Sequence, residues 1–269
     1  MFRIYRDLLA AFWGGFALFS VLLLVINLYL LSDAALVSSI VLFAVAVFAL
    51  AIVLQLKADK RLRQLEEQLL EQCRVREYIA AYEALLQRPC AKDATIAKAL
   101  YTNLAIGYSL LGDDMRTFQL MQYAVPPAGN SVTVRRQQVV YCNNMAHYYV
   151  AAGDADNAAK AAADLRQLLT TFKRTDPIQM LQYNLMLTEL DIRLLRGHAQ
   201  GVKTALEIAL QGATRPYNQV SLHRSLATAC RLEGNTAEAV QHLQSILQVG
   251  GDSRHVAWAR EQLMTIQAE

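Results

Sequence analysis

The sequence is poor in the residues from which metal sites, redox pairs and active sites are built. Its 269 residues include four cysteines and five histidines. The cysteines form no C-x-x-C pair and the histidines show no H-E-x-x-H or similar spacing, so the sequence predicts no metal site, no redox pair and no cofactor. Because Cys142 and Cys230 fall on apolar helix faces, we expect buried, reduced thiols in a cytosolic domain.

An excess of charge of one sign is also lacking. The chain has 26 basic and 23 acidic residues, interspersed along its length, and a net charge of +3 is too small to indicate nucleic-acid binding. Asn143, Asn144 and His147, beside Cys142, resemble part of a catalytic cluster. Adjacent residues on a helix, however, point about 100° apart and do not face each other. We therefore expect no catalytic residue and no enzymatic activity.

Proline is scarce, with five in the chain, and no sustained alternation of β-branched and polar residues occurs. These absences argue against β-strands. Leucine, alanine and glutamine instead recur with helical spacing between short turns. The sequence therefore predicts an all-α fold.

Long apolar runs, by contrast, are present at the beginning of the chain. Leu8–Leu31 and Ala34–Leu56 contain no Lys, Arg or Glu and are separated only by Ser32-Asp33. A spanning helix needs roughly 20 apolar residues, so residues 1–57 are predicted to form a two-helix membrane hairpin. The alternative for the first run is a cleaved signal peptide, but its apolar core of about 7–15 residues would be shorter.

Basic residues flank the hairpin on one side only. Arg3 and Arg6 precede the first run, and four basic residues follow the second: Lys57, Lys60, Arg61 and Arg63. This bias predicts a multi-pass protein of the cell membrane with both termini in the cytoplasm. The four residues could also contact anionic lipid headgroups, although setting the topology alone would explain them. Within the hairpin, we expect Asn27 to hydrogen-bond Ser38 or Ser39 across the two helices.

Residues 58–90 read as a charged helical stalk followed by a first packing helix. Leu62, Leu65 and Leu69 have a heptad-like spacing, which leaves a dimeric stalk as an alternative. The preferred interpretation is that the stalk continues the second membrane helix and that residues 78–86 pack on the domain that follows.

Four glycine turns then divide the chain into similar units. Gly112, Gly153, Gly197 and Gly234 each separate two helical patterns, at spacings of 41, 44 and 37 residues. A left-handed glycine ends one helix and a polar residue after it can cap the next, and Asn235 to Glu238 reads as a capping box. Such a period is the signature of an α-solenoid.

The units resemble the tetratricopeptide repeat (TPR) family. Apolar, small and aromatic residues occupy the positions that the family expects on the first helix of units one, two and four: Leu104, Ala105 and Tyr108; Met145, Ala146 and Tyr149; Leu226, Ala227 and Cys230. On the second helices the corresponding small or looser matches are Thr117, Ala158, Val202 and Ala239. The third unit departs most, with Glu189, Leu190 and Arg193. The resemblance implies that residues 91–269 form a right-handed α-solenoid of about four helix pairs, closed by a capping helix at 252–266.

TPR stacks bind peptides in the groove lined by their first helices. Carried over to this chain, the groove positions with useful polar chemistry are Asn143, His147, Asn184, Asp191, Arg224, Thr228 and Arg231. Arg224 and Arg231 share a helix face and would suit an acidic tail, whereas a plain solvated face is the alternative. Thr102 and Ile106 stand where the family's carboxylate clamp needs Lys and Asn, so binding of chaperone tails is not expected.

The function implied is a membrane-anchored TPR-like scaffold or adaptor, at the inner face of a membrane that we expect to be bacterial. Its partner would be a protein or peptide. Two alternatives stay open: a regulator that responds to a ligand or peptide, and an accessory subunit of a larger membrane complex.

Overall fold

The computed structural model describes residues 6–30 and 33–268, and it is helical throughout with no β-strand in those ranges. The first part contains α1 (Arg6–Leu30), α2 (Asp33–Gln72) and α3 (Val75–Leu86). Nine further helices follow: α4 (Ala94–Leu111), α5 (Asp114–Tyr123), α6 (Val132–Ala151), α7 (Ala155–Leu169), α8 (Leu181–Leu195), α9 (Val202–Gly212), α10 (Pro216–Leu232), α11 (Thr236–Val249) and α12 (Arg254–Ala268). Short 3₁₀ turns, η2 (Pro89–Lys92) and η3 (Pro177–Met180), precede α4 and α8.

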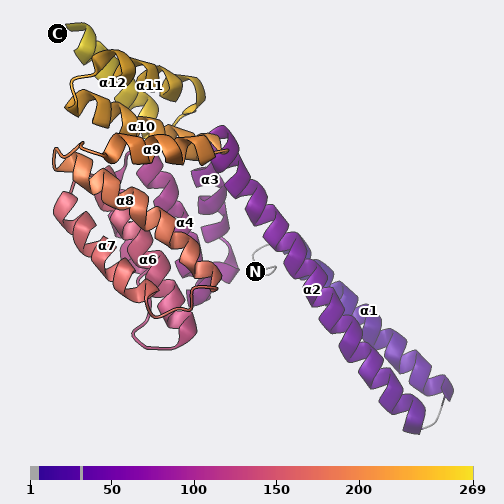
Figure 1. Cartoon of the computed structure of the whole chain (residues 1–269). Helices are drawn as coiled ribbons and strands as arrows, with labels where there is room; N and C mark the ends of the chain where they lie inside the picture. Colours follow the sequence, from indigo (N-terminus) through magenta and orange to yellow (C-terminus); the bar gives the residue numbers. More distant parts are fainter. Residues whose placement is uncertain (1–5, 31–32, 269) are drawn as a thin grey trace.

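The all-α prediction is therefore confirmed, and so is the presence of two helices long and apolar enough to cross a membrane. Figure 1 shows α1 and α2 packed side by side and projecting as a rod from the other helices. Only 6% of the residues in each apolar window are buried, and Leu18, Leu42 and Phe48 are each more than 60% exposed. A core helix of a soluble domain would hide such side chains.

The second apolar helix continues without a break into the charged stalk, as the sequence predicted. α2 has 40 residues, which corresponds to about 60 Å at 1.5 Å per residue, about twice the hydrocarbon thickness of a bilayer. Leu69 near its end is buried within the chain, and Leu62 and Leu65 pack against the same apolar cluster. The helix face that would form the interface of a dimeric stalk is therefore in contact with residues of the same chain. The side chains of Asn27, Ser38 and Ser39 lie outside the described part, as do Arg3 and Ser32.

Behind the stalk, consecutive helices pack against each other, most extensively α4 with α5, α6 with α7 and α10 with α11, and also α7 with α8 and α9 with α10. Tyr78, Tyr82 and Leu85 of α3 are buried against α4, which confirms that 78–86 pack on the following domain. The small residues singled out in the sequence lie at these helix contacts and are fully buried: Ala105, Ala146, Ala158, Ala227 and Ala239. Short side chains there let the helix axes approach closely.

The four turn glycines all have the left-handed backbone conformation that the sequence predicted, with φ between 77° and 91°. Asp113 and Asp154 then cap α5 and α7 by accepting backbone N–H bonds from Arg116 and Asn157. The prediction is wrong at the third turn, because α9 begins only at Val202, after a second left-handed glycine, Gly201. A loop at 198–201 therefore replaces the expected cap.

The capping box at Asn235 is only half formed. Asn235 Oδ1 accepts the backbone N–H of Glu238, as expected. The backbone N–H of Asn235, however, already bonds to the carbonyl of Cys230, so the Glu238 carboxylate accepts from the Asn235 side-chain amide instead. Glu238 is thereby held on the face of α11 that looks toward α9 and α10, where Lys203 also reaches it.

The end of the chain returns to the start of the helical domain. Cys73 has a left-handed backbone conformation, with φ 50°, and interrupts the helix between α2 and α3. The Asp252 carboxylate accepts the first two backbone N–H groups of α3, from Val75 at 2.6 Å and Arg76 at 3.1 Å. Asp252 N–H donates in turn to the Cys73 carbonyl. The turn between α11 and α12 thus supplies the N-terminal cap of α3 from 177 residues away.

Gly251 makes this contact possible, and replacing it tests how much the domain depends on it. The residue has φ 57°, and a Cβ there would overlap the Cys73 carbonyl. Gly197→Ala is a matched control, because Gly197 has φ 78° but open space around the added Cβ. We expect left-handed strain of about 1–2 kcal/mol in both variants.

Gly251→Ala should lose a further 0.5–2 kcal/mol or so, as the cap on α3 breaks. The measurement is the unfolding midpoint of the full chain in detergent. Equal losses in the two variants would show that the contact contributes little to stability.

Candidate functional site

The residues expected to line a groove lie on α6, α8 and α10, and three of them hydrogen-bond to neighbouring helices. Asn143 and His147 come from α6, Asn184 and Asp191 from α8, and Arg224, Thr228 and Arg231 from α10. Each of the seven is buried or partly buried. A plain solvated face, the alternative weighed from the sequence, does not describe them.

His147 connects α6 to α8. Its Nε2 lies 3.4 Å from the Thr188 hydroxyl, which itself donates to the carbonyl of Asn184. A hydroxyl has one proton, so the imidazole N–H must donate to Thr188. Burial lowers the pKa of His147 to about 4, which leaves the ring neutral at physiological pH. This histidine is therefore a structural hydrogen-bond donor in the free protein.

Asp191 connects α8 to α10 in a similar way. Its carboxylate accepts a hydrogen bond from Ser225. Burial raises the pKa of Asp191, and the nearby positive charge of Arg224 and the Ser225 bond only partly offset that effect. The positive charge of Arg224 and the Ser225 hydrogen bond thus both favour the ionised form of Asp191.

The remaining predicted residues differ in their surroundings. Arg231 donates to Gln262 of α12, and the Thr228 hydroxyl donates to a carbonyl of its own helix. Asn143 donates its amide to Asn144, while its buried Oδ1 has no partner among the described residues. Asn184 contributes its backbone carbonyl to the Thr188 bond.

Arg224, one of the predicted residues, lines a cavity. The cavity has a volume of about 340 Å³ and lies between α10, α12 and the ends of α4 and α6. Arg224, Arg254, His255 and Trp258 line it together with Glu261. The Arg224 guanidinium lies 5.8 Å from the centre of the Trp258 ring, within the range of a cation–π contact.

The two arginines of the cavity have different bonding. Arg254 makes a two-pronged ion pair with Asp114 of α5 and a further bond to the Ser109 carbonyl. The Arg224 guanidinium donates no hydrogen bond to any residue in the described part of the chain. Burial lowers the pKa of Arg224, while Asp191 raises it. Arg224 therefore lines the cavity as a positive charge that has no hydrogen-bonded acceptor among the described residues, and the Glu261 carboxylate lines the same cavity.

The uncharged imidazole of His255 lines the same cavity. Burial, reinforced by Arg224 and Arg254, lowers the pKa of His255 to about 3. An uncharged imidazole can donate and accept hydrogen bonds without adding to the positive charge. Arg224 and the neutral imidazole can donate hydrogen bonds to one carboxylate or another small anion beside an aromatic ring, while the negative charge of Glu261 in the same lining opposes an anion.

Three of the cavity residues, Arg254, His255 and Trp258, were not expected from the sequence. They lie on α12, which the repeat pattern indicates only as a capping helix. Their spacing would place them on adjoining faces of one helix, but nothing in the sequence says that this helix lies beside α10 and the end of α4. That contact comes from the return of the chain end described above.

Comparison of the chain with protein-family models, with curated proteins and with solved structures finds no match in any of the three.

The low pKa of His147 makes a testable difference to acid stability. The unfolded histidine, with a pKa near 6.5, takes up a proton at a higher pH than the folded one. Stability contributed by the neutral ring is complete above pH 6.5 and is lost as the pH falls toward 4. His147→Gln keeps a donor for Thr188 but does not titrate.

We expect the wild-type free energy of unfolding to fall between pH 7 and pH 4 by on the order of 1–3 kcal/mol more than that of His147→Gln. Urea unfolding of the full chain in detergent measures this difference. His198→Gln, at an exposed position, should keep the wild-type dependence. Identical pH profiles for wild type and His147→Gln would rule out a buried neutral ring.

Proposed function

We propose that the chain is a membrane-anchored, TPR-like adaptor that holds a protein or peptide partner at the cytoplasmic face, and that an acidic group of the partner binds Arg224. The observation that carries the second half of this proposal is the Arg224 guanidinium, which is partly buried beside Trp258, lines the cavity and has no hydrogen-bonded acceptor in the described part of the chain. A partner carboxylate could accept two parallel hydrogen bonds there.

The repeat assignment draws support from local features of each unit. Left-handed glycines end the first helices, aspartates cap two of the second helices, and fully buried alanines lie where the helices cross. The turn glycines and the small residues are the features on which the resemblance to the TPR family rests. In our proposal, α4 to α11 form four helix pairs of a right-handed α-solenoid, and α12 covers its end.

The membrane assignment draws support from the exposed apolar surfaces of α1 and α2. A hairpin of this length would place the charged end of α2 at the inner headgroups, where Lys57, Lys60, Arg61 and Arg63 follow the apolar run. Since α2 enters the helical domain without a break, the domain would be held close to the bilayer. Tethering of this kind raises the effective concentration of a bound partner at the membrane.

The second candidate function is a regulator that binds a small ligand. It is favoured because the residues that line the cavity come from distant parts of the chain. Gly112 belongs to the first unit, whereas Arg224 and Trp258 belong to the last unit and the final helix. A small anion bound there would contact both ends of the helical domain and could tighten their contact. This candidate predicts thermal stabilisation by a free small carboxylate, without any peptide.

The orientation of the hairpin can be tested by labelling single added cysteines. In cells that express Ser32→Cys or Glu269→Cys, we expect a membrane-impermeant maleimide to label position 32 in intact cells and position 269 only after lysis. The protein without an added cysteine measures the background labelling of its native cysteines. Labelling of position 269 in intact cells would reverse the orientation and exclude a cytoplasmic adaptor.

The role of Arg224 can be tested with paired peptides. Full-length protein in detergent is presented with an array in which each acidic peptide has a partner carrying Asn and Gln in place of Asp and Glu. We expect binding that requires the carboxylates. A charge-assisted bond contributes about 1.5–3 kcal/mol, so Arg224→Gln should weaken this binding about 10- to 100-fold.

Arg260→Gln is the matched control, because Arg260 is exposed on α12 and does not line the cavity. Equal binding of acidic peptides and their amide counterparts would count against the proposal. So would equal effects of the Arg224 and Arg260 substitutions.

A further inference from the structure

The pair of helices α10 and α11 brings a thiol, a carboxylate and an imidazole to one place, away from the Arg224 cavity. Cys230 lies in the last turn of α10, while Glu238 and His242 lie one helical turn apart on α11. Since residues four apart share a helix face, Glu238 and His242 both look toward Cys230 across the turn at Gly234. The Cys230 side chain is fully buried.

Their donor atoms are close enough to share one ion. The Cys230 sulfur, a Glu238 oxygen and a His242 ring nitrogen all lie within 4.8 Å of one another. His242 Nε2 is 4.0 Å from Glu238 Oε1. Ligands of one zinc ion, each about 2.0–2.3 Å from it, lie roughly 3–4 Å apart, so small side-chain movements would complete the coordination.

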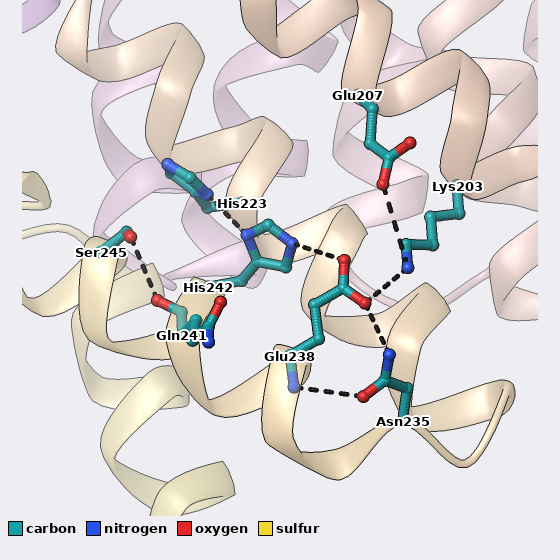
Figure 2. Close-up of polar contacts among 8 residues, drawn as sticks. All are labelled: Lys203, Glu207, His223, Asn235, Glu238, Gln241, His242 and Ser245. Carbon is teal, nitrogen blue, oxygen red and sulfur yellow. Dashed lines mark hydrogen bonds and ion pairs between the residues drawn. The ribbon is translucent and has the colours of Figure 1, made fainter.

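His223 holds the ring of His242 in place from the other side. The two Nδ1 atoms are 3.0 Å apart, and Figure 2 shows His242 between His223 and Glu238. One Nδ1 must donate and the other accept. When His242 donates, its Nε2 carries a lone pair directed toward Glu238. That Nε2 is buried and has no hydrogen-bond partner in the described structure.

In the tautomer in which His242 donates to His223, a cation would bind between these two acceptors. Without one, the Nε2 lone pair and the Glu238 carboxylate face each other across a gap too long for a hydrogen bond. Metal-binding histidines commonly donate their second ring nitrogen to a neighbouring acceptor, which is the role that His223 has in this arrangement. Burial also lowers the pKa of both His223 and His242, which favours the neutral rings that bind metals.

Lys203 of α9 is the one group here that opposes a cation. Its ammonium donates to Glu238 Oε2 at 2.5 Å, on the far side of the carboxylate from His242 (Figure 2). Oε1 is left for an ion, but the positive charge of Lys203 would weaken binding. The lysine also keeps Glu238 ionised, since its hydrogen bond lowers the pKa of that carboxylate.

We propose that Cys230, Glu238 and His242 form a binding site for a zinc ion, with a solvent molecule as the fourth ligand and His223 as a positioning residue. Thiolate, imidazole and carboxylate are the three ligand types that zinc combines in proteins, and a soft thiolate disfavours magnesium and calcium. Burial raises the pKa of Cys230 to about 11, so the thiol must release its proton to solvent when zinc binds.

An ion at this position would tie α10 to α11. The same two helices pack against α12, which supplies Arg254, His255 and Trp258 to the cavity. Zinc should therefore raise the thermal unfolding midpoint of the domain, because a ligand that binds only the folded state stabilises it by mass action. Zinc binding at this site does not depend on which partner the protein binds.

Cobalt(II) is a suitable probe, since a thiolate ligand gives it a charge-transfer absorption band in the near ultraviolet. Full-length protein in detergent, stripped with a chelator, is titrated with cobalt(II) alone. We expect the band to saturate at one equivalent and to disappear when zinc is added. Cys230→Ser should abolish it, whereas Cys142→Ser, on α6, should leave it unchanged.

Because Ser at a fully buried position can impair folding, Glu238→Gln supplies a second test at a partly exposed residue. It should weaken cobalt binding at least tenfold, and His223→Gln should weaken it about 10- to 100-fold. Glu207→Gln is the matched control, because Glu207 also faces Lys203 but is not one of the ligands (Figure 2). The proposal is overturned if millimolar cobalt gives no band, if the band survives in Cys230→Ser, or if Glu238→Gln binds like wild type.

Discussion

The cap that Asp252 places on the N-terminus of α3 is the contact on which the shape of the helical domain depends. A helix that begins after a break at Cys73 exposes backbone N–H groups, and the chain supplies their acceptor from the turn before its last helix. Gly251 is needed there because only a residue without Cβ can approach the Cys73 carbonyl so closely. With this contact made, α12 lies beside α4 and α5, and Arg254 can pair with Asp114. The Arg224 cavity exists because of that return.

A line of polar pairs runs across the helical domain. His147 with Thr188, Asp191 with Ser225, and Arg231 with Gln262 connect α6, α8, α10 and α12 in order. Buried polar groups are costly unless they are paired, so each pair fixes which faces of adjacent helices meet. Three of the positions that a TPR-like groove would offer to a peptide are therefore used for contacts between helices, and Arg224 lines the cavity.

Helix α10 has two different polar faces. One carries Arg224 at the cavity, and the other carries Cys230 of the proposed zinc site. Arg224 is directed to α12, while His223 and Cys230 are directed to α11. An ion held between α10 and α11 would stiffen the helix that carries Arg224 without contacting the cavity itself. The hairpin α1–α2 has a separate role, since it presents apolar surface outward and continues as a straight helix into the domain.

The sequence by itself determined the features that depend on neighbours along the chain. The two apolar runs, the helical periodicity and the left-handed glycines at 112, 153, 197 and 234 can all be read locally, because helix formation and helix termination depend on nearby residues. It failed at residues 198–201, where a second glycine, Gly201, delays the start of α9. Only the tertiary structure decided the contacts of Asp252 with α3, of α12 with α4, and of Cys230 with His242. These join residues on different helices, up to 177 positions apart, and no local propensity records which distant helix will lie alongside.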